Sequence, residues 1–257
     1  MHRFFVEKNQ IQGNRITITG GDVNHIRNVL RMKERDELVI SAGDNKEYTC
    51  RVEEITPEQV TAVVTDVQEK GVELPSKIYL FQGLPKGDKM ELIIQKAVEL
   101  GVYEIIPVAT KRCVVKLDAK KEAAKLRRWQ LISESAAKQS GRMAVPEIAG
   151  VMSFSEALAY ARSLDVRLIP YERETDMKKT KEIVNHIVPG ESIGIFIGPE
   201  GGFAEEEIGQ AMENDVVPIT LGKRILRTET AGFTVLSILM FSLEQEERKQ
   251  DSGSISG

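Results

Sequence analysis

Two stretches of this chain place glycine, charge and apolar residues together where a strand is expected to end. The first is GPEGGF at 198–203, directly after the apolar run 192–197, and the second is LGKRILRTETAG at 221–232. Glycine-rich turns after strands often bind phosphate through backbone N–H groups. A carboxylate such as Glu200 would repel a phosphate, so the first loop indicates a different ligand.

Neither of the glycine-containing strand ends carries a nucleotide fingerprint. GPEGG lacks the GxGxxG spacing, and PKGDK at 85–89 lacks the GxxxxGK[ST] spacing in which backbone amides and a lysine wrap phosphates. A tight strand-to-helix turn, in which glycine supplies a positive φ, is the alternative interpretation of each loop. The sequence therefore disfavours ATP and NAD sites.

The second loop combines features that a solvent-facing turn does not need. It carries Leu221, Ile225 and Leu226 together with Arg224 and Arg227. Open α/β sheets bind ligands in the crevice outside the carboxyl ends of their strands. The first loop would offer close backbone approach and a carboxylate, and the second would offer apolar walls and two arginines.

Residues 1–70 have the pattern of a small β-rich unit. We expect strands at 3–6, 15–19, 37–41, 47–52 and 59–64, and a helix from 23 to about 32 that Asp22 caps. These strands would form a meander that closes as a small barrel. The polar segment 71–76 is the expected linker.

From residue 77 the pattern changes to alternating strands and helices, which predicts an α/β domain over 77–248 and a flexible tail over 249–257. The expected strands are 78–81, 103–108, 166–170, 191–197 and 216–221. The expected helices are 88–100, 119–139, one that Ser153 caps, 205–212, and 228–244 with Thr228 as a cap. This alternation predicts a mostly parallel sheet with helices on both faces, and we expect Phe4, Phe5 and Trp129 to be core residues.

Composition narrows the function classes. The 257 residues include two cysteines and three histidines, without metal-ligand spacing, so we expect no metal and a reducing, cytoplasmic location. The net charge of −4 is unevenly distributed: residues 1–35 carry 7 Lys and Arg against 3 Asp and Glu, and residues 83–145 carry 13 against 7. Two basic stretches on an acidic chain suit a local polyanion footprint, although ordinary solvated faces would give the same counts.

Six motifs, spread in order over nearly the whole chain, resemble one family. They are HRFFV at 2–6, HIRNVLRMKERDEL at 25–38, KGDKMELIIQKAVELGV at 86–102, SAAKQSGRMAVP at 135–146, GPEGGF at 198–203 and LGKRILRTETA at 221–231. Together they are similar to the methyltransferases of the SPOUT superfamily that methylate N3 of a uridine in 16S ribosomal RNA.

The resemblance implies a fold, a cofactor and partners. The fold would be an α/β sheet with a C-terminal trefoil knot, plus a small N-terminal PUA-like β-barrel. The cofactor would be S-adenosylmethionine, whose sulfonium cation tolerates Glu200, and the chain would form a homodimer. The residues expected at the cofactor are Leu168, Tyr171, Ile197, Gly198, Pro199, Glu200, Gly201, Gly202, Leu221, Gly222, Ile225 and Leu226.

The reaction sets requirements on the charged residues. Uridine N3 must lose its proton, or its anion must be stabilised, before it attacks a methyl group. Arg227 could stabilise charge that spreads onto the uracil carbonyls, and Glu200 or Glu229 could take the proton or orient the base. The alternative for Glu229 is a favourable helix-dipole interaction, with Arg227 only its ion-pair partner.

The implied partner is 16S rRNA, on the 30S subunit, with the target base unpaired or flipped. The candidate phosphate contacts are Arg3, Arg27, Arg31, Lys86, Lys89, Arg112, Arg127, Arg128 and Arg142. Two other functions stay open: a methyltransferase of the same superfamily acting on ribose 2′-O or on transfer RNA, and a non-catalytic RNA-binding module.

Overall fold

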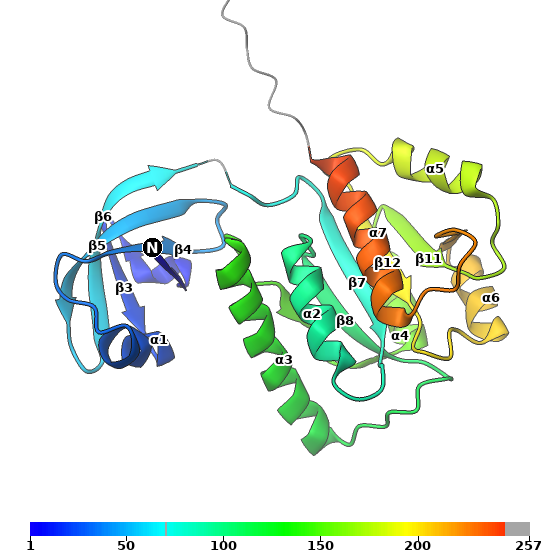
Figure 1. Cartoon of the computed structure of the whole chain (residues 1–257), viewed down its shortest axis with the longest axis horizontal. Coiled ribbons are helices and arrows are strands. Elements are labelled where there is room, and N and C mark those ends of the chain that lie inside the picture. The colour runs from blue at the N-terminus through cyan, green and yellow to red at the C-terminus, as the bar shows by residue number, and fades with distance from the viewer. Residues whose placement is uncertain (70, 245–257) are drawn as a thin grey trace, which may run out of the picture.

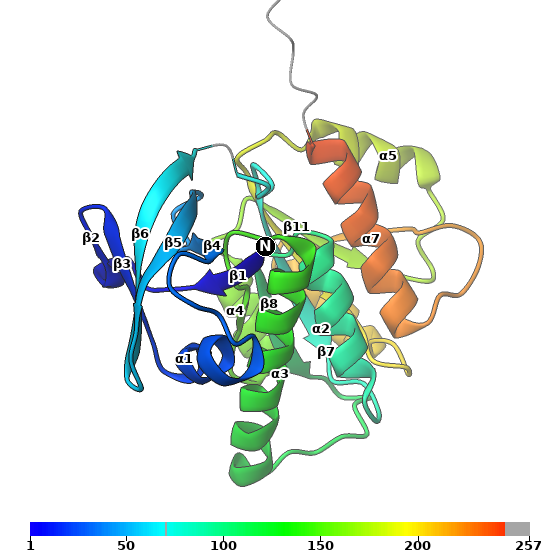
Figure 2. The same cartoon turned by 60° about the vertical axis from the view of Figure 1, so that its left-hand side comes forward.

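The computed structural model describes residues 1–69 and 71–244, which form two β-sheets with their associated helices (Figure 1). The strands up to residue 68 form one lobe and the strands from residue 77 form the core of the other (Figure 2). The predicted flexible tail at 249–257 lies outside the described residues.

The N-terminal sheet has six strands in the order β1-β4-β5-β6-β3-β2. β1 pairs with β4 in parallel, and the other pairs are antiparallel. This hydrogen-bonded path is open, so in the described residues the strands form a curved sheet whose two edges are not joined by pairing. The strands are β1 His2–Phe5, β2 Ile11–Gln12, β3 Arg15–Thr19, β4 Glu37–Ser41, β5 Glu47–Ile55 and β6 Gln59–Gln68.

Short helices complete this lobe: η1 Lys8–Gln10, α1 Gly21–Asn24 and the π-helical turn η2 His25–Val29. Val23 and Ile26 project from α1 and η2 into a core that includes Phe4, which is 1% exposed as expected for a core residue. The prediction that Asp22 caps the helix is wrong. The cap is Gly20, with φ +74°, and the Asp22 carboxylate instead accepts a hydrogen bond from Lys138.

The second sheet is parallel in every described pairing, with the order β10-β8-β7-β12-β11-β13 and with β9 paired to β8. β12 lies between β7 and β11, and both of these neighbours precede it in the chain. The strands are β7 Lys77–Gly83, β8 Glu104–Ala109, β9 Glu147–Ile148, β10 Met152–Ser153, β11 Val166–Pro170, β12 Ser192–Ile197 and β13 Val217–Ile219.

Helices cover both faces of this sheet, as predicted. Four of them, α2 Lys89–Glu99, α3 Ala119–Ser140, α5 Met177–His186 and α7 Thr228–Leu243, contribute to the core on one face. On the other face, α4 Phe154–Ala161 and α6 Glu205–Glu213 pack around the stacked rings of Phe81 and Phe196. α5 was not predicted, because only Thr180 and Val184 of its mostly polar residues are buried.

Helix ends follow local rules where the sequence supplies them. Asp118 accepts a hydrogen bond from the Lys121 N–H at the start of α3, and Gly141, with φ +73°, ends that helix. Ser153 caps α4 together with Glu156 in a capping box. Trp129 of α3 is 3% exposed, as expected for a core residue. No helix in the described ranges has the length and apolar character needed to cross a membrane.

Arg142, a predicted phosphate contact, is a structural residue. It is 5% exposed, its Nε lies 2.8 Å from Glu73 Oε2, and it donates to the backbone carbonyls of Val98 and Val102. A buried arginine with all its partners inside the protein is not available to RNA. Its hydrogen bonds instead fix the segment between the two sheets against the end of α2.

Candidate functional site

The carboxyl ends of β7, β11, β12 and β13 meet at one edge of the second sheet. Ile197 of β12 pairs with Gln82 of β7, so the GPEGGF loop leaves the sheet directly beside Gly83. A Cβ on Gly83 would lie 2.7 Å from Pro199 Cδ, and only glycine permits this approach. This is the edge at which an open α/β sheet binds its ligands.

The Thr228 hydroxyl connects three segments at this edge. Gln82 Nε2 donates to Thr228 Oγ1 at 2.9 Å, and Thr228 Oγ1 donates to the Gly198 carbonyl at 2.6 Å. Gln82 is 0% exposed and Thr228 is 5% exposed, so water does not compete for these bonds. The strand end of β7, the GPEGGF loop and the first residue of α7 are thereby held together.

This arrangement corrects one prediction and adds a residue that the sequence analysis missed. Thr228 does not cap α7, because the N-cap is Arg227 and Thr228 is the first helical residue. Gln82 was not a candidate, although a buried amide within the apolar run 78–84 is the kind of exception that indicates a polar partner.

The GPEGGF loop is a tight turn. The Gly202 N–H donates to the Pro199 carbonyl at 2.8 Å, and Gly202 has φ +66°. A Cβ on Gly198 would lie 3.1 Å from the Gly202 backbone, whereas a Cβ on Gly202 would meet open space. Arg112, a predicted phosphate contact, donates from Nη1 to the Gly201 carbonyl at 2.8 Å and thus supports the loop.

Lys89 is the electrostatic centre of the site. Its Nζ lies 3.0 Å from Glu200 Oε1 and 3.5 Å from Glu229 Oε2. The Lys86 N–H also donates to the Glu200 carboxylate, at 3.1 Å. Lys89 was predicted to contact RNA phosphate, but its ammonium group is engaged by these two carboxylates.

The pKa values of this pair follow from the contacts. The hydrogen bond to Glu200 raises the pKa of Lys89 above its ordinary value. Partial burial alone would raise the pKa of Glu200, but the hydrogen bonds from Lys89 and from the Lys86 N–H hold that pKa below its ordinary value. Glu200 is therefore ionised at neutral pH and is a weak proton acceptor.

The loop that precedes α7 leaves its backbone unpaired. Over 221–226, the one hydrogen bond within the described ranges runs from the Gly222 N–H to Thr220 Oγ1, at 3.3 Å. Gly222 has φ +113° and open space where a Cβ would stand. Ile225 is 88% exposed, and Leu221 and Leu226 are half-buried. Free backbone groups beside apolar side chains suit a ligand with both polar and apolar parts.

Three predicted cofactor residues differ in what they can offer. Leu168 is 0% exposed in the centre of β11, where its side chain packs into the core, so only its backbone can face a ligand. Ile197 is also a core residue, at 2% exposed, and only its backbone can reach a ligand. Tyr171 is half-buried at the end of β11, and its N–H donates to the Ile219 carbonyl.

The charged residues around the site differ in whether their side chains have partners within the protein. Arg227 is exposed, and no ion pair or hydrogen bond engages its side chain within the described part of the chain. Glu229 is largely buried, and its Oε2 accepts no hydrogen bond despite the nearby Lys89 ammonium. Arg3, a predicted phosphate contact, is instead paired with Glu47 and Ser41, whereas Arg27, Arg31 and Lys86 have exposed side chains.

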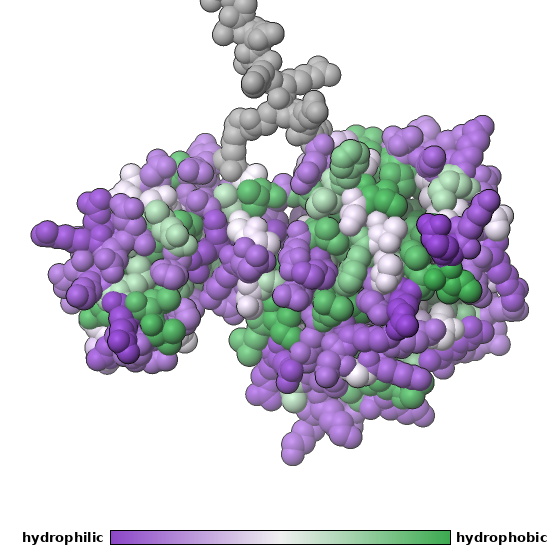
Figure 3. All heavy atoms as spheres, viewed as in Figure 1, coloured by the Kyte–Doolittle hydropathy of each residue, from purple (hydrophilic) through white to green (hydrophobic). Residues whose placement is uncertain are grey.

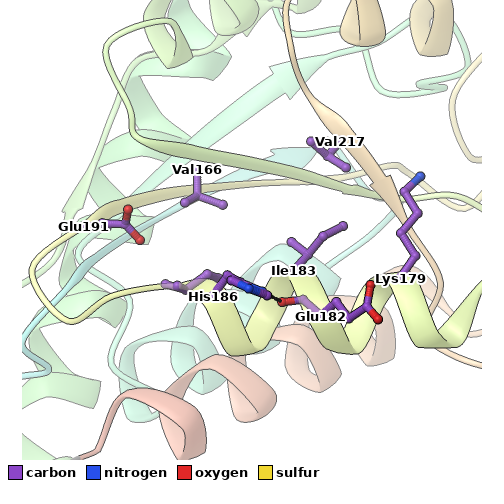
Figure 4. A pocket seen from close by; sticks show the side chains of 8 residues that line it. Val166, Lys179, Glu182, Ile183, His186, Glu191 and Val217 are labelled. Atoms are coloured by element: carbon purple, nitrogen blue, oxygen red, sulfur yellow. Dashed lines mark hydrogen bonds between the residues drawn. The ribbon is translucent and has the colours of Figure 1, made fainter.

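A separate cavity of about 520 Å³ lies between α5 and the sheet (Figure 4). Val166 and Val217, at the amino ends of β11 and β13, line it together with Ile183 and His186 of α5. The His186 ring is held by the Glu182 carbonyl at 2.6 Å. Because this cavity faces the amino ends of the strands, none of the glycine loops reaches it.

Comparisons with known proteins agree with this geometry. Residues 72–240 match the family model of an RNA methyltransferase domain, and residues 18–65 match that of an RNA methyltransferase PUA domain. The chain is 40% identical to the ribosomal RNA small subunit methyltransferase E of Bacillus subtilis, over 95% of this chain and 98% of that protein. It is 36% identical to the enzyme of the same name from Mesomycoplasma hyopneumoniae, over 92% and 98%.

Solved structures give the same result. A ribosomal RNA small subunit methyltransferase E from Neisseria gonorrhoeae, bound to S-adenosylmethionine, has 34% identity and a TM-score of 0.81, over 94% of this chain and 97% of that one. A putative methyltransferase from Legionella pneumophila, in complex with the same cofactor, has the same identity and TM-score. The chain belongs to the ribosomal RNA small subunit methyltransferase E family.

Proposed function

We propose that this protein transfers the methyl group of S-adenosylmethionine to N3 of a uridine in 16S rRNA. The observation that carries the proposal is the junction at Thr228, which brings two glycine-containing loops together beside Arg227 and Glu229. The names of the relatives support rRNA as the substrate, and the motif resemblance supports the N3 position. A cytoplasmic site of action follows from this substrate.

The loops suit the cofactor by their chemistry. The unpaired backbone of 221–226 can hydrogen-bond adenine and ribose, and Leu221, Ile225 and Leu226 can cover the apolar faces of the ring. The open space at Gly202 and Gly222 permits close backbone approach. When bound, the cofactor supplies an electrophilic methyl group.

The two carboxylates take different roles in this proposal. Glu200, ionised and occupied by Lys89 and the Lys86 N–H, positions the loop. Glu229 Oε2 is buried 3.5 Å from Lys89 Nζ and accepts no hydrogen bond among the described residues, so Glu229 is less tightly held than Glu200, and we assign to it the N3 proton or the orientation of the base. Arg227 has no side-chain partner in the described ranges and would stabilise negative charge on the uracil carbonyls.

The chain organisation forms part of the proposal. Residues 1–70 would be the PUA-like RNA-binding unit, 71–76 the linker and 77–248 the methyltransferase domain with its trefoil knot. In support, β12 is inserted between β7 and β11, and α7 returns from the edge strand β13 to contact α2. A crystal structure in which the C-terminal segment does not pass through a loop of the chain would contradict the knot.

The proposed function predicts which nucleoside is formed. Purified protein should transfer the labelled methyl group of S-adenosylmethionine to 30S particles from a strain that lacks this protein, and nucleoside analysis should show 3-methyluridine. Particles from a strain that contains the protein are the matched control and should accept little label. A ribose 2′-O-methyl product, or label found only in transfer RNA, would contradict the assignment in favour of another methyltransferase.

Thr228→Val should weaken S-adenosylmethionine binding, because it leaves Gln82 and the Gly198 carbonyl without their buried partner. Such a loss costs about 1–3 kcal/mol, which corresponds to a roughly 5- to 150-fold weaker affinity if the loops bear the cost. Calorimetry measures the affinity of each variant for S-adenosylmethionine. Thr230→Val, on the exposed part of the same helix turn, is the control. Equal affinities in the two variants would disprove the role of the junction.

Arg227→Ala should lower the methyl-transfer rate at saturating substrates by roughly 100-fold, while cofactor affinity stays within about twofold of the parent. Its proposed partner is charge that develops on uracil during the reaction. Arg224→Ala, at another exposed arginine of the same loop, should retain the rate. Normal turnover in Arg227→Ala would remove this residue from the mechanism.

The outward face of α7 supports the proposed homodimer. Ile238 is 42% exposed and Phe241 is 83% exposed, one helical turn apart, and apolar surface is visible over this helix in Figure 3. An exposed apolar patch of this kind indicates an interface.

Light scattering should give about twice the chain mass for the parent and for Val188→Glu, and a monomer for Phe241→Glu. A monomeric parent would contradict the dimer.

A further inference from the structure

The amino-terminal half of α3, with the loop before it, is the most basic surface segment outside the site. Residues 116–128 carry six Lys and Arg against two Asp and Glu. Lys121 pairs with Asp118 at 3.0 Å and Arg128 pairs with Glu91 at 2.7 Å. The remaining exposed cations are Lys116, Lys120 and Arg127, and none of them has a carboxylate partner in the part of the chain that the structure describes.

This charge is unfavourable for the helix itself. The amino-terminal end of an α-helix carries a partial positive charge and is stabilised by acidic residues, so Lys120 at the start of α3 opposes the dipole. Only Asp118 and Glu122 offset it locally. This argument applies to Lys120 alone, since Lys116 precedes the helix and Arg127 lies beyond its first turn; exposed cations of this kind suit contact with an external polyanion.

The location of this segment connects it to the site. In both views the first turns of α3 extend past α2 toward the end of the domain at which β7 ends, and α2 lies between α3 and α7 (Figures 1 and 2). Lys125 and Trp129 of α3 line a small hollow together with Leu84 and Gly87, next to the exposed Lys86. This part of α3 therefore borders the segment 84–88, in which the Lys86 N–H donates to the Glu200 carboxylate.

The other end of α3 leads to the N-terminal lobe. Lys120 and Arg127 lie two turns apart on the outward face, and Lys138 follows on the same face at the far end. The 18 residues from Lys120 to Lys138 span about 27 Å. Lys138 is bound to Asp22, at the beginning of the α1–η2 segment that carries Arg27. A notch between the two lobes is visible in Figure 3.

We infer that the outward face of α3, through Lys116, Lys120 and Arg127, is a phosphate track that guides the rRNA strand between the methyl-transfer site and Arg27 and Arg31. This inference rests on the proposed function for the identity of the nucleic acid. Phosphate contacts fix the register of a strand and carry no sequence information, which suits lysine and arginine on a rigid helix. The track thus positions the target nucleotide without reading it.

The test compares two double variants by their binding to a naked 16S rRNA transcript at several salt concentrations. Lys120→Gln with Arg127→Gln should weaken binding, and should reduce the slope of log affinity against log salt by about 1.4, at roughly 0.7 per lost contact with a single strand. Lys178→Gln with Lys181→Gln, on exposed α5, removes the same charge and is the control. It should retain the parent slope.

Two further measurements separate this inference from the proposed function. Calorimetry with S-adenosylmethionine should give unchanged cofactor affinity in the α3 variant, and methyl transfer should show a raised KM for rRNA with kcat retained. An affinity and salt slope equal to those of the control would overturn the track, even if methyl transfer is confirmed. A defect with 30S particles but not with naked rRNA would also overturn it, because the partner would then be a ribosomal protein. If the parent methylates no rRNA, the proposed function fails. The comparison of salt slopes for rRNA binding between the two double variants would still test the phosphate track.

Discussion

A single buried hydroxyl holds the site together. Thr228 accepts a hydrogen bond from Gln82 and donates one to the Gly198 carbonyl, and thus joins segments that lie 146 and 30 residues away in the chain. A hydroxyl in this environment costs stability unless both of its hydrogen bonds form. The end of β7, the GPEGGF loop and the start of α7 therefore have one mutual arrangement, which leaves the 221–226 backbone open to a ligand.

Charge is distributed around this junction to suit an anionic partner. Lys89 lies 3.0 Å from Glu200 and 3.5 Å from Glu229, so one ammonium group offsets part of the negative charge that the two carboxylates would otherwise present to RNA. Among the described residues the Arg227 side chain has no ion-pair partner, so this cation can respond to charge that develops on a substrate. The same division holds on a larger scale. Arg3, Arg112 and Arg142 are engaged by other groups of the protein, although Arg112 is exposed, whereas Arg27, Arg31 and the outward face of α3 remain available.

Local sequence rules predicted much of the fold and part of the site. The Ser153 cap of α4 and the strand–helix alternation were readable because each depends on a few neighbouring residues. The position of β12 between β7 and β11, the use of Arg142 as a buried anchor and the contact of Gln82 with Thr228 depend on pairs distant in the chain. Periodicity carries no information about such pairs, so the loops could be found from the sequence whereas the bonds that join them could not.

The most direct test of the account is amide hydrogen exchange with and without S-adenosylmethionine. The structure predicts that the cofactor slows exchange in 198–203 and 221–228, because these loops would close on it and the Thr228 junction couples them. The α5 segment 177–187, which borders the separate cavity at the other end of the strands, should exchange as in the free protein. Protection of α5 with no change in the two glycine loops would contradict the assignment of the site.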